Sequence, residues 1–186
     1  MVGIGTALND DPQLNVRRLP PQETPYNTPR PIILDTSLRL TPTCKLLRNF
    51  KNGVGRRPWI LCSDVFTDEK TRRLQELEGA GAKIISIPVA EDGGGLMLDS
   101  VLSTLRSLGI RSLMVEGGQR VITSFLSDAG KYDLIDSLII TVAPTFIGKQ
   151  GISALSNETT DIPALNHVSS IVLGKDTVIA CRIRST

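Results

Sequence analysis

The fold of this chain is decided by one stretch, Val115-Glu116-Gly117-Gly118-Gln119-Arg120-Val121-Ile122. It follows an apolar run from Ile110 to Val115, which has the length of a buried strand. Gly117 and Gly118 then remove two side chains at the point where the backbone must turn. Apolar residues resume at helical spacing in Val121, Ile122, Phe125 and Leu126. The pattern predicts a strand over 110–116, a sharp turn, and a helix over 118–129.

The Gly117-Gly118 turn is also a candidate anion site. A turn at the N-terminus of a helix presents backbone N–H groups at the positive end of the helix dipole, which suits a phosphate or pyrophosphate. Glu116 stands at the carboxyl end of the predicted strand, which is the edge where α/β proteins bind ligands. A tight turn without any ligand explains the same residues, so the rest of the chain has to decide.

Strands and helices alternate along most of the sequence. Strands are predicted over 30–35, 57–63, 83–89, 110–116 and 137–143, and helices over 67–80, 98–108 and 118–129. The last two predicted strands, 167–173 and 177–183, are joined at Gly174-Lys175-Asp176 in a hairpin. This order predicts an α/β fold with a mostly parallel central sheet, helices on both faces, and a C-terminal antiparallel hairpin at one edge. Without repeats or a second domain, residues 1–186 are expected to form a single domain.

Three features of the connections supplement this outline. Thr67 is a candidate N-cap for the helix that follows it. The segment from Thr36 to Arg57 is expected to be a long loop, and long loops are often functional. Gly93 to Gly95 is interpreted as a surface loop, because no helix begins directly at it.

Composition excludes several classes of function. A formal net charge of +2 and an aromatic content of 4% argue against nucleic acid and acidic membranes as partners. No apolar run is long enough to span a membrane, and no signal peptide pattern opens the chain. The cysteines Cys44, Cys62 and Cys181 are too few and too far apart for a disulfide framework or a metal knuckle. We therefore expect a reducing, cytoplasmic location.

A second dense cluster lies at the start of the chain, from Gly3 to Arg17. Gly5 and Thr6 are expected to end a short apolar strand, and Asp10-Asp11-Pro12 is a turn signal. The Thr6 hydroxyl and the Asp10 carboxylate can hold ribose hydroxyls, and the Arg17 guanidinium suits a phosphate. A capped, solvated turn is the alternative. Asp10 and Asp11 make a poor metal site, because adjacent side chains seldom point the same way, so no metal is expected.

Three segments in this order resemble the riboflavin-biosynthesis reductases: Gly3-Ile4-Gly5-Thr6 through Arg17, Val115-Glu116-Gly117-Gly118, and Ala143-Pro144-Thr145-Phe146-Ile147-Gly148. The resemblance is to the fungal and archaeal 2,5-diamino-6-ribosylamino-4(3H)-pyrimidinone 5′-phosphate reductases, and to the reductase domain of the bacterial bifunctional deaminase-reductase. It implies a dihydrofolate-reductase-like fold, a homodimer, and NADPH-dependent reduction of the ribosyl side chain to ribityl at C1′.

The resemblance also implies roles for particular residues. The implied cofactor-binding positions are Thr6, Asp10, Thr36, Gly117, Gly118, Gln119, Arg120 and Val121, within a segment that continues to Ser124. The implied substrate-binding positions are Leu14, Arg17 and Glu116, with Arg17 apt for the 5′-phosphate. No catalytic residue is assigned, and Glu116 is expected to orient the pyrimidine. Basic residues that could meet the 2′-phosphate of NADPH, or simply face solvent, are Arg39, Arg56 and Arg57.

Members of the family carry further chain before the Gly-Ile-Gly-Thr motif. We therefore expect this chain to lack an N-terminal segment that supplies a sheet strand, a helix and polar residues. A gene model that starts at an internal methionine, a fragment, and a true short form stay open as explanations.

Other functions stay open as well. The alternatives are another NADPH-dependent reductase of the same fold and a truncated nucleotide-binding remnant without activity. A Rossmann dehydrogenase is disfavoured because no Gly-x-Gly-x-x-Gly follows the first strand. His167 is the only histidine, so a histidine-based triad is not expected.

Overall fold

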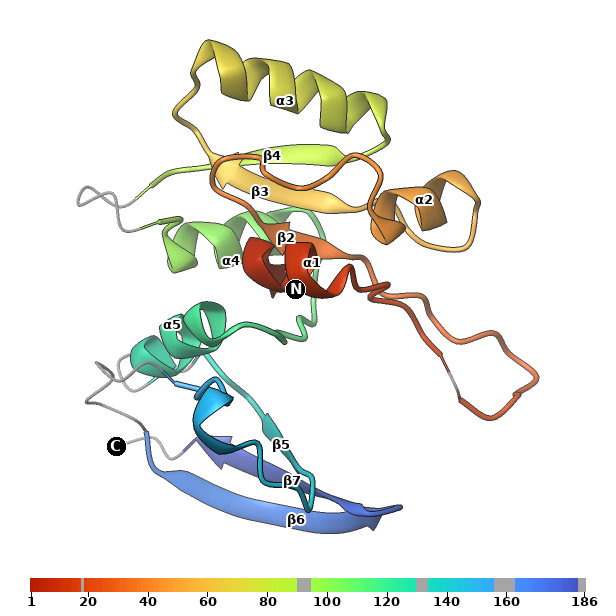
Figure 1. Cartoon of the computed structure of the whole chain (residues 1–186), viewed down its shortest axis with the longest axis vertical. Helices are drawn as coiled ribbons and strands as arrows, with labels where there is room; N and C mark the ends of the chain where they lie inside the picture. Colours follow the sequence, from red (N-terminus) through yellow and green to blue (C-terminus); the bar gives the residue numbers. More distant parts are fainter. Residues whose placement is uncertain (18, 90–94, 130–133, 156–162, 184–186) are drawn as a thin grey trace. The chain divides into compact units, whose positions relative to one another are not determined.

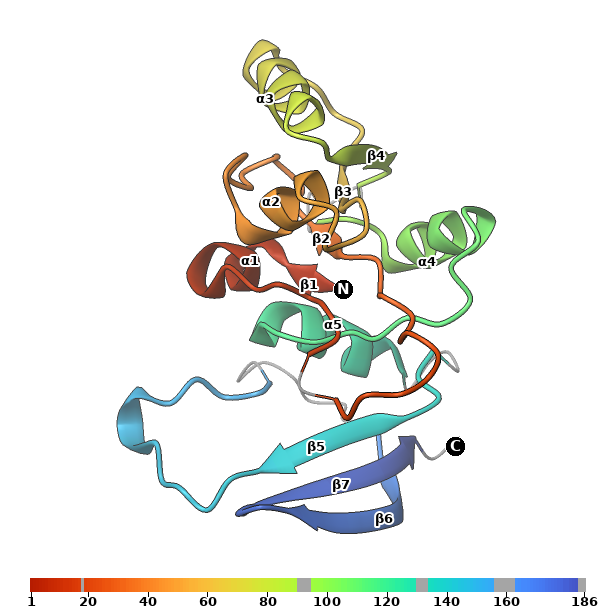
Figure 2. The same ribbon diagram turned by 90° about the vertical axis from the view of Figure 1, so that its right-hand side faces the viewer.

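A four-stranded parallel sheet organises the first half of the chain (Figures 1 and 2). The computed structural model describes residues 1–17, 19–89, 95–129, 134–155 and 163–183, in two compact units that divide between Gly118 and Gln119. The elements of the first unit are β1 (Val2–Gly3), α1 (Ile4–Asp10), β2 (Ile32–Leu34), α2 (Lys45–Lys51), β3 (Trp59–Ser63), α3 (Asp68–Gly79), β4 (Lys83–Ile87) and α4 (Leu98–Ser107). The sheet order is β1-β2-β3-β4, and every pair is parallel.

Helices cover both faces of this sheet, as predicted. Figure 2 shows α1, α2 and α3 on one side of the strands and α4 on the other. On the first side one buried cluster joins Ile33 and Ile60, which are partners in register, to Ala7, Leu47 and Leu77 from the three helices. On the other side α4 is anchored by two buried side chains, Val101 and Leu105. Each fully buried aliphatic side chain contributes about 1.5–3 kcal/mol, so these contacts fix the sheet and helices together.

The second unit is a separate antiparallel sheet with one helix. Its elements are α5 (Gln119–Ala129), β5 (Leu138–Val142), a short 3-10 turn η1 (Gly148–Gln150), β6 (Leu165–Leu173) and β7 (Asp176–Ile183). The predicted hairpin is confirmed: Leu173 pairs with Asp176 across Gly174, which has φ +64°. Its predicted place at the edge of the parallel sheet is wrong, since β5 pairs with the free side of β7 in the order β5-β7-β6.

The strand predicted over 110–116 is not formed as a regular strand. Among the described residues, the backbones of Met114 and Glu116 bond to Met1: the Met1 nitrogen donates to the Met114 carbonyl at 2.6 Å, and the Glu116 N–H donates to the Met1 carbonyl at 3.0 Å. This is the pattern of a parallel pair, with Val115 opposite Met1. A single such pair is too short for a ladder, although it holds the segment extended beside β1.

Two further expectations about the first unit are wrong. Gly5 and Thr6 do not end a strand, because β1 ends at Gly3 and both residues lie inside α1. The segment from Thr36 to Arg57 is not simply a loop, since it contains α2. The Asp11 carboxylate accepts the Lys45 N–H at 2.8 Å and so satisfies a backbone donor in the first turn of α2. That partner lies 34 residues away, and no local pattern signals it.

The predicted N-cap of α3 is confirmed. The Thr67 hydroxyl accepts the Lys70 N–H at 3.2 Å and caps α3. Gly109 follows α4 with φ +89°, a conformation that suits a residue without a side chain. Gly93 and Gly94 lie outside the described residues, and Gly95 has φ +126°.

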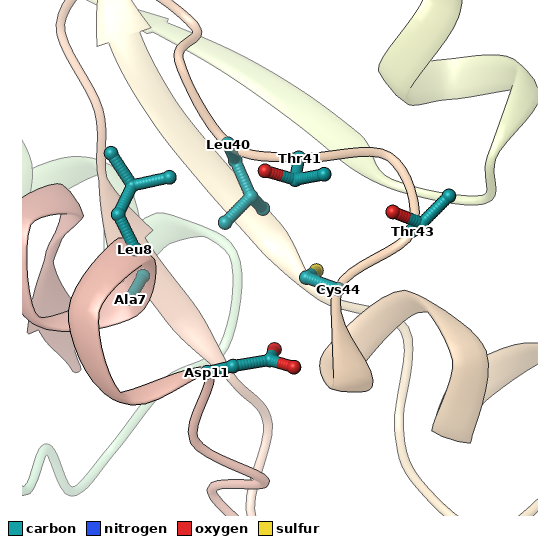
Figure 3. Close-up of a pocket in the computed structure, with 7 residues that line it drawn as sticks. All are labelled: Ala7, Leu8, Asp11, Leu40, Thr41, Thr43 and Cys44. Atoms are coloured by element: carbon teal, nitrogen blue, oxygen red, sulfur yellow. The ribbon is translucent and has the colours of Figure 1, made fainter.

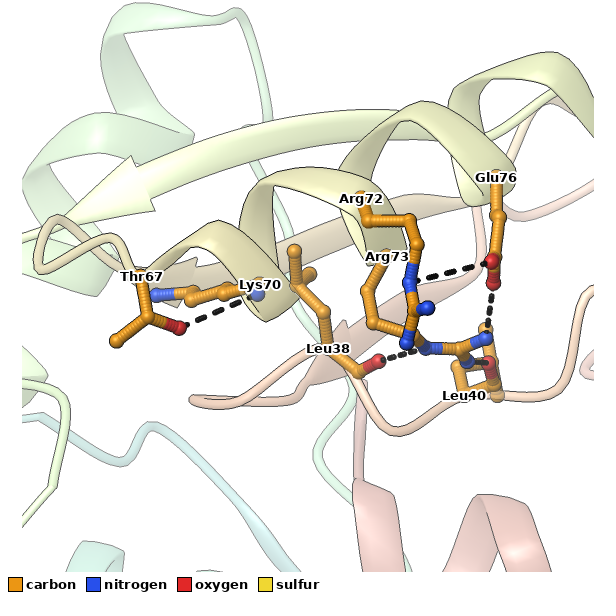
Figure 4. Close-up of polar contacts among 7 residues, drawn as sticks. All are labelled: Leu38, Leu40, Thr67, Lys70, Arg72, Arg73 and Glu76. Atoms are coloured by element: carbon orange, nitrogen blue, oxygen red, sulfur yellow. Dashed lines mark hydrogen bonds and ion pairs between the residues drawn. The ribbon is translucent and has the colours of Figure 1, made fainter.

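The segment that follows β2 is locked in place by one carboxylate and one guanidinium. Asp35 is fully buried, and its carboxylate accepts the Leu40 N–H at 2.8 Å. From α3, Arg73 donates to the carbonyls of Leu38, at 3.2 Å, and Leu40, at 2.7 Å, and it also bonds Glu76 (Figure 4). Leu38 can therefore hold a left-handed φ of +56° with its side chain fully buried.

We expect Asp35 to make the stability of the fold depend on pH. Burial raises the pKa of the Asp35 carboxyl above its ordinary value of 3.8, against the opposing effects of its backbone hydrogen bonds and of Arg39 and Arg73. The folded state then binds more protons than the unfolded state, so this carboxyl costs stability as pH rises from 3.8 through its folded-state pKa. Asp35→Asn should remove that loss, so the variant gains free energy of unfolding relative to the parent chain as pH rises.

Urea denaturation across a pH series measures this difference. The new buried amide changes the free energy of unfolding by an amount that does not depend on pH. The result is therefore read from the slope of the free energy of unfolding against pH, not from its absolute value. Asp64→Asn, at an exposed carboxylate beyond β3, is the control for the loss of one charge. Parallel pH curves for the parent chain and the Asp35 variant would contradict the expectation.

Candidate functional site

The Gly117-Gly118 turn is fastened to α1 by a contact that leaves no room for a side chain. Gly117 has φ +89°, and a Cβ on it would lie 2.8 Å from both Cγ2 and Oγ1 of Thr6. The Gly118 N–H donates to Thr6 Oγ1 at 2.7 Å. One of the N–H groups expected to face a ligand anion is therefore already paired, and the Thr6 hydroxyl keeps its own proton to donate.

Beside this turn lies a cleft of about 560 Å³ within the first unit. It brings together six of the residues singled out from the sequence: Thr6, Asp10, Leu14, Arg17, Glu116 and Gly117. The other lining residues are Met1, Val2, Pro12, Asn15, Val16, Pro29, Arg30 and Met114. Segments about a hundred residues apart thus meet at one place, beside β1 and along the chain that follows α1.

The cleft has polar groups of both charges. Asp10 and Glu116 supply exposed carboxylates, and Arg17 and Arg30 supply guanidinium groups. Such a lining suits a ligand that has hydroxyl or amino donors at one part and an anion at another.

One wall of the cleft is strained. Leu14 has φ +44°, which is uncommon for a bulky residue, and its side chain packs partly against the buried cluster. The neighbouring Asn15 side chain donates to the Val54 carbonyl at 2.7 Å and accepts the Val16 N–H at 2.9 Å. These bonds hold the unusual conformation, and strain of this kind concentrates at functional sites.

The remaining predicted residues lie outside this cleft. Thr36 follows the carboxyl end of β2, half-buried, and its carbonyl accepts the Ser63 N–H at 3.2 Å. Gln119, Arg120 and Val121 form the first turn of α5 in the second unit, where the Gln119 side chain donates to the Leu155 carbonyl at 2.6 Å. The expected segment up to Ser124 lies in the same helix.

The three candidate arginines divide between two edges of the sheet. Arg39 is exposed on the locked segment after β2, at the carboxyl edge. Arg56 and Arg57 precede β3, at the amino edge. The Arg57 guanidinium donates to the carbonyls of Gly81, at 3.1 Å, and Ala82, at 2.7 Å, so it holds the chain before β4.

Sequence reasoning missed Arg30 as a cleft residue. In the sequence, Arg30 stands directly before Pro31 and β2, and this position indicates only the start of a strand. The residue reaches the cleft because the chain returns there after the long proline-rich segment, and no sequence spacing measures that return.

A smaller cavity of about 200 Å³ lies on another side of α1 (Figure 3). Ala7, Leu8 and Asp11 from α1 and its end face Leu40, Thr41, Thr43 and Cys44 across it. Cys44 is buried, and burial raises the pKa of its thiol. The Asp11 carboxylate at its edge is already bonded to Lys45.

Neither a metal centre nor a membrane span is found in the described parts of the chain. There, His, Cys, Asp and Glu side chains do not gather in groups of three or more that could hold a metal ion. The helices described are likewise too short or too polar to cross a membrane.

Comparison with known proteins decides the family. Residues 1–179 match the model of the RibD C-terminal domain. The chain belongs to the RibD C-terminal domain family. This is a family of riboflavin-biosynthesis reductases that use NAD(P)H and act on a pyrimidine, so the chain is a member of an oxidoreductase family with a dihydrofolate-reductase-like fold.

Individual relatives agree with this RibD assignment. The 2,5-diamino-6-ribosylamino-4(3H)-pyrimidinone 5′-phosphate reductase of Debaryomyces hansenii is 39% identical over 155 residues, which are 82% of this chain and 60% of the relative. The chain thus spans about three fifths of the length of that relative. Among solved structures, the riboflavin biosynthesis reductase Rib7 of Saccharomyces cerevisiae matches with a TM-score of 0.72 and 26% identity, covering 98% of this chain and 74% of Rib7. RibD of Acinetobacter baumannii matches with a TM-score of 0.75 and 25% identity, covering 98% of this chain and 46% of that RibD chain.

We expect Gly117→Ala to destabilise the first unit in two separable ways. The φ of +89° costs an alanine on the order of 1–3 kcal/mol, and the contact with Thr6 adds to that cost. Gly109 has the same φ of +89° with nothing within 4 Å of a Cβ, so Gly109→Ala measures the backbone cost alone. Urea denaturation should show the larger loss for Gly117→Ala.

A second substitution isolates the Thr6 contact. In a Thr6→Ala background the extra cost of Gly117→Ala over Gly109→Ala should shrink, because both close atoms of Thr6 are gone. Equal losses for the two glycine variants in the parent chain would show that the turn does not press on Thr6.

Proposed function

We propose that this chain is the reductase unit that converts the ribosyl side chain of 2,5-diamino-6-ribosylamino-4(3H)-pyrimidinone 5′-phosphate to ribityl, with NADPH as the reductant. The observation that carries the proposal is the cleft, which gathers Thr6, Asp10, Leu14, Arg17, Glu116 and Gly117. Relatives that bear the name of this reductase, at up to 39% identity among those compared, support the substrate.

The turn at Gly117 supports the cofactor. The Gly117 backbone packs directly against Thr6, whose hydroxyl has a proton left to donate. A backbone turn and a hydroxyl donor therefore lie together, as a pyrophosphate site requires. We assign Thr6, Asp10, Thr36, Gly117 and Gly118 to the cofactor, together with Gln119, Arg120 and Val121. NADPH, when bound, supplies the hydride that reduces C1′.

The other cleft residues hold the substrate. The Glu116 carboxylate accepts hydrogen bonds from amino groups of the pyrimidine, and so orients the ring without donating a proton. Arg17 forms charge-assisted hydrogen bonds with the 5′-phosphate. Leu14 packs against the sugar from its strained position. Most of the catalytic effect then comes from holding two reactants in contact, which is worth several kcal/mol without an acid or base.

We further propose that the two units form one reductase domain, because the family model runs across both of them through residue 179. A homodimer and a cytoplasmic location complete the proposal. The three cysteines are free and buried, as suits a reducing compartment.

The reductase proposal predicts NADPH oxidation with the ribosylaminopyrimidine phosphate. The assay follows the loss of NADPH absorbance for this chain and for a version that carries in-frame residues upstream of Met1. Product identity is checked by mass, since ribityl carries two more hydrogen atoms than ribosyl. If the extended protein binds NADPH tightly but leaves this substrate unchanged, the assignment fails in favour of a nucleotide-binding remnant or a reductase with another substrate.

Arg39 is proposed to select NADPH over NADH. It is the one of the three candidate arginines that lies at the carboxyl edge of the sheet, on a segment locked by Asp35 and Arg73. An arginine beside the ribose is the usual way to accept a 2′-phosphate. Arg39→Ala should lower the ratio of kcat/KM for NADPH to that for NADH by about ten- to hundredfold, which is the worth of a charged hydrogen bond.

Arg106→Ala is the matched control for this test, because Arg106 is exposed at the end of α4 and lines neither cavity. Its cofactor ratio should equal that of the parent chain. An unchanged ratio in the Arg39 variant would show that a residue other than Arg39 contacts the 2′-phosphate.

A further inference from the structure

Cations gather around Trp59 at the amino end of the parallel sheet. The Arg30 guanidinium lies over the indole ring at 4.4 Å from its centre, and the Lys83 ammonium lies 4.7 Å from it. Arg30 also donates to the carbonyl of Arg57 at 2.8 Å. Trp59 itself is buried, at 7% exposure, so Arg30 rests on a rigid base.

None of the ion pairs in the described part of the chain includes Arg30, Arg57 or Lys83. The ion pairs described there involve Asp11 and Glu76, with Lys45, Arg48, Arg72 and Arg73 as partners. Burial, followed by the charges of Arg56 and Arg57, lowers the pKa of the Arg30 guanidinium below its ordinary value. Like charges held together repel one another, and a bound anion would relieve the repulsion.

Arg30 is the member of this group that lines the substrate cleft, where Arg17 is the only other arginine or lysine among the lining residues. One N–H of Arg30 is bonded to the Arg57 carbonyl. A guanidinium has five N–H donors, so a pair remains to bind an oxyanion in the forked manner. The stacking on Trp59 fixes the side chain beforehand and reduces the entropy lost on binding.

We propose that Arg30, together with Arg17, forms an anion subsite of the cleft that binds a phosphate monoester. Arg17 and Arg30 supply two positive charges, and Lys83, Arg56 and Arg57 add further positive charge near Arg30. This arrangement matches the double negative charge of a phosphate ester better than the single charge of a carboxylate. That this ester belongs to the substrate rests on the proposed reductase function. The binding of a phosphate ester by Arg30 does not depend on it.

Trp59 provides the measurement, since it is the only tryptophan in the chain and Arg30 lies on its ring. Titration with ribose 5-phosphate should change the Trp59 emission in a saturable way, and ribose at the same concentrations should not. The apparent Kd should rise with salt, as expected for a partly exposed charge pair. Inorganic phosphate should compete with the ester.

Two substitutions at Arg30 test its role. Arg30→Gln should weaken the binding of ribose 5-phosphate by about ten- to hundredfold. Arg30→Lys, which keeps the charge and loses the fork, should fall between the parent chain and Arg30→Gln. The control is Arg106→Gln, which removes the same charge from an exposed helix end outside the cleft and should bind as the parent does.

Calorimetry provides a second readout, because Arg30→Gln also alters the surroundings of Trp59, and urea denaturation verifies that each variant is folded. Failure of the parent chain to bind ribose 5-phosphate, or equal binding by Arg30→Gln, would overturn the subsite. The titration contains no NADPH and no pyrimidine. If ester binding depends on Arg30 while the pyrimidine is not reduced, the subsite stands and the reductase proposal alone fails.

Discussion

The contact between Thr6 and the Gly117-Gly118 turn is the constraint on which the first unit's site depends. It joins residues 112 apart by one hydrogen bond, from Gly118 N–H to Thr6 Oγ1, and by a packing contact that admits no Cβ on Gly117. Because Thr6 lies in α1 directly after β1, this contact sets the extended segment that carries Glu116 beside the start of the sheet. The cleft is the space enclosed between that segment and the chain that follows α1.

The rest of the unit supports this arrangement by fixing its backbone at a few charged or polar points. Asp11 ends α1 in a left-handed conformation and bonds the first turn of α2, so the chain leading to Leu14 and Arg17 starts from a fixed place. Arg73 and Asp35 hold the segment after β2 from two sides. In each case a side chain satisfies backbone groups of an irregular segment, which would otherwise be unpaired and free to move. Residues that we propose contact the ligand, such as Leu14 and Arg17, are thereby positioned in advance of binding.

Local sequence features predicted much of the fold. The strands at Ile32, Trp59 and Lys83, the cap at Thr67 and the hairpin at Gly174 follow from apolar runs and turn residues that act over a few positions. Predictions failed where the partner is distant. The 110–116 segment has the composition of a strand, but in the described structure it pairs with Met1 alone, and α2 is completed by a carboxylate from another part of the chain. Strand composition does not say which neighbour is present, or in which sheet.

By itself the sequence determined the family, the glycines at the turn, and the residues that we propose bind a phosphorylated sugar, because those are properties of short motifs. Only the tertiary structure decided which of these residues share one cleft. It placed Thr6, Asp10, Arg17 and Glu116 together, set Arg39 and Arg57 at opposite edges of the sheet, and brought Arg30 onto Trp59 beside the cleft. Proximity between distant residues depends on how the strands pair and on where the long connections return, and no local spacing encodes either.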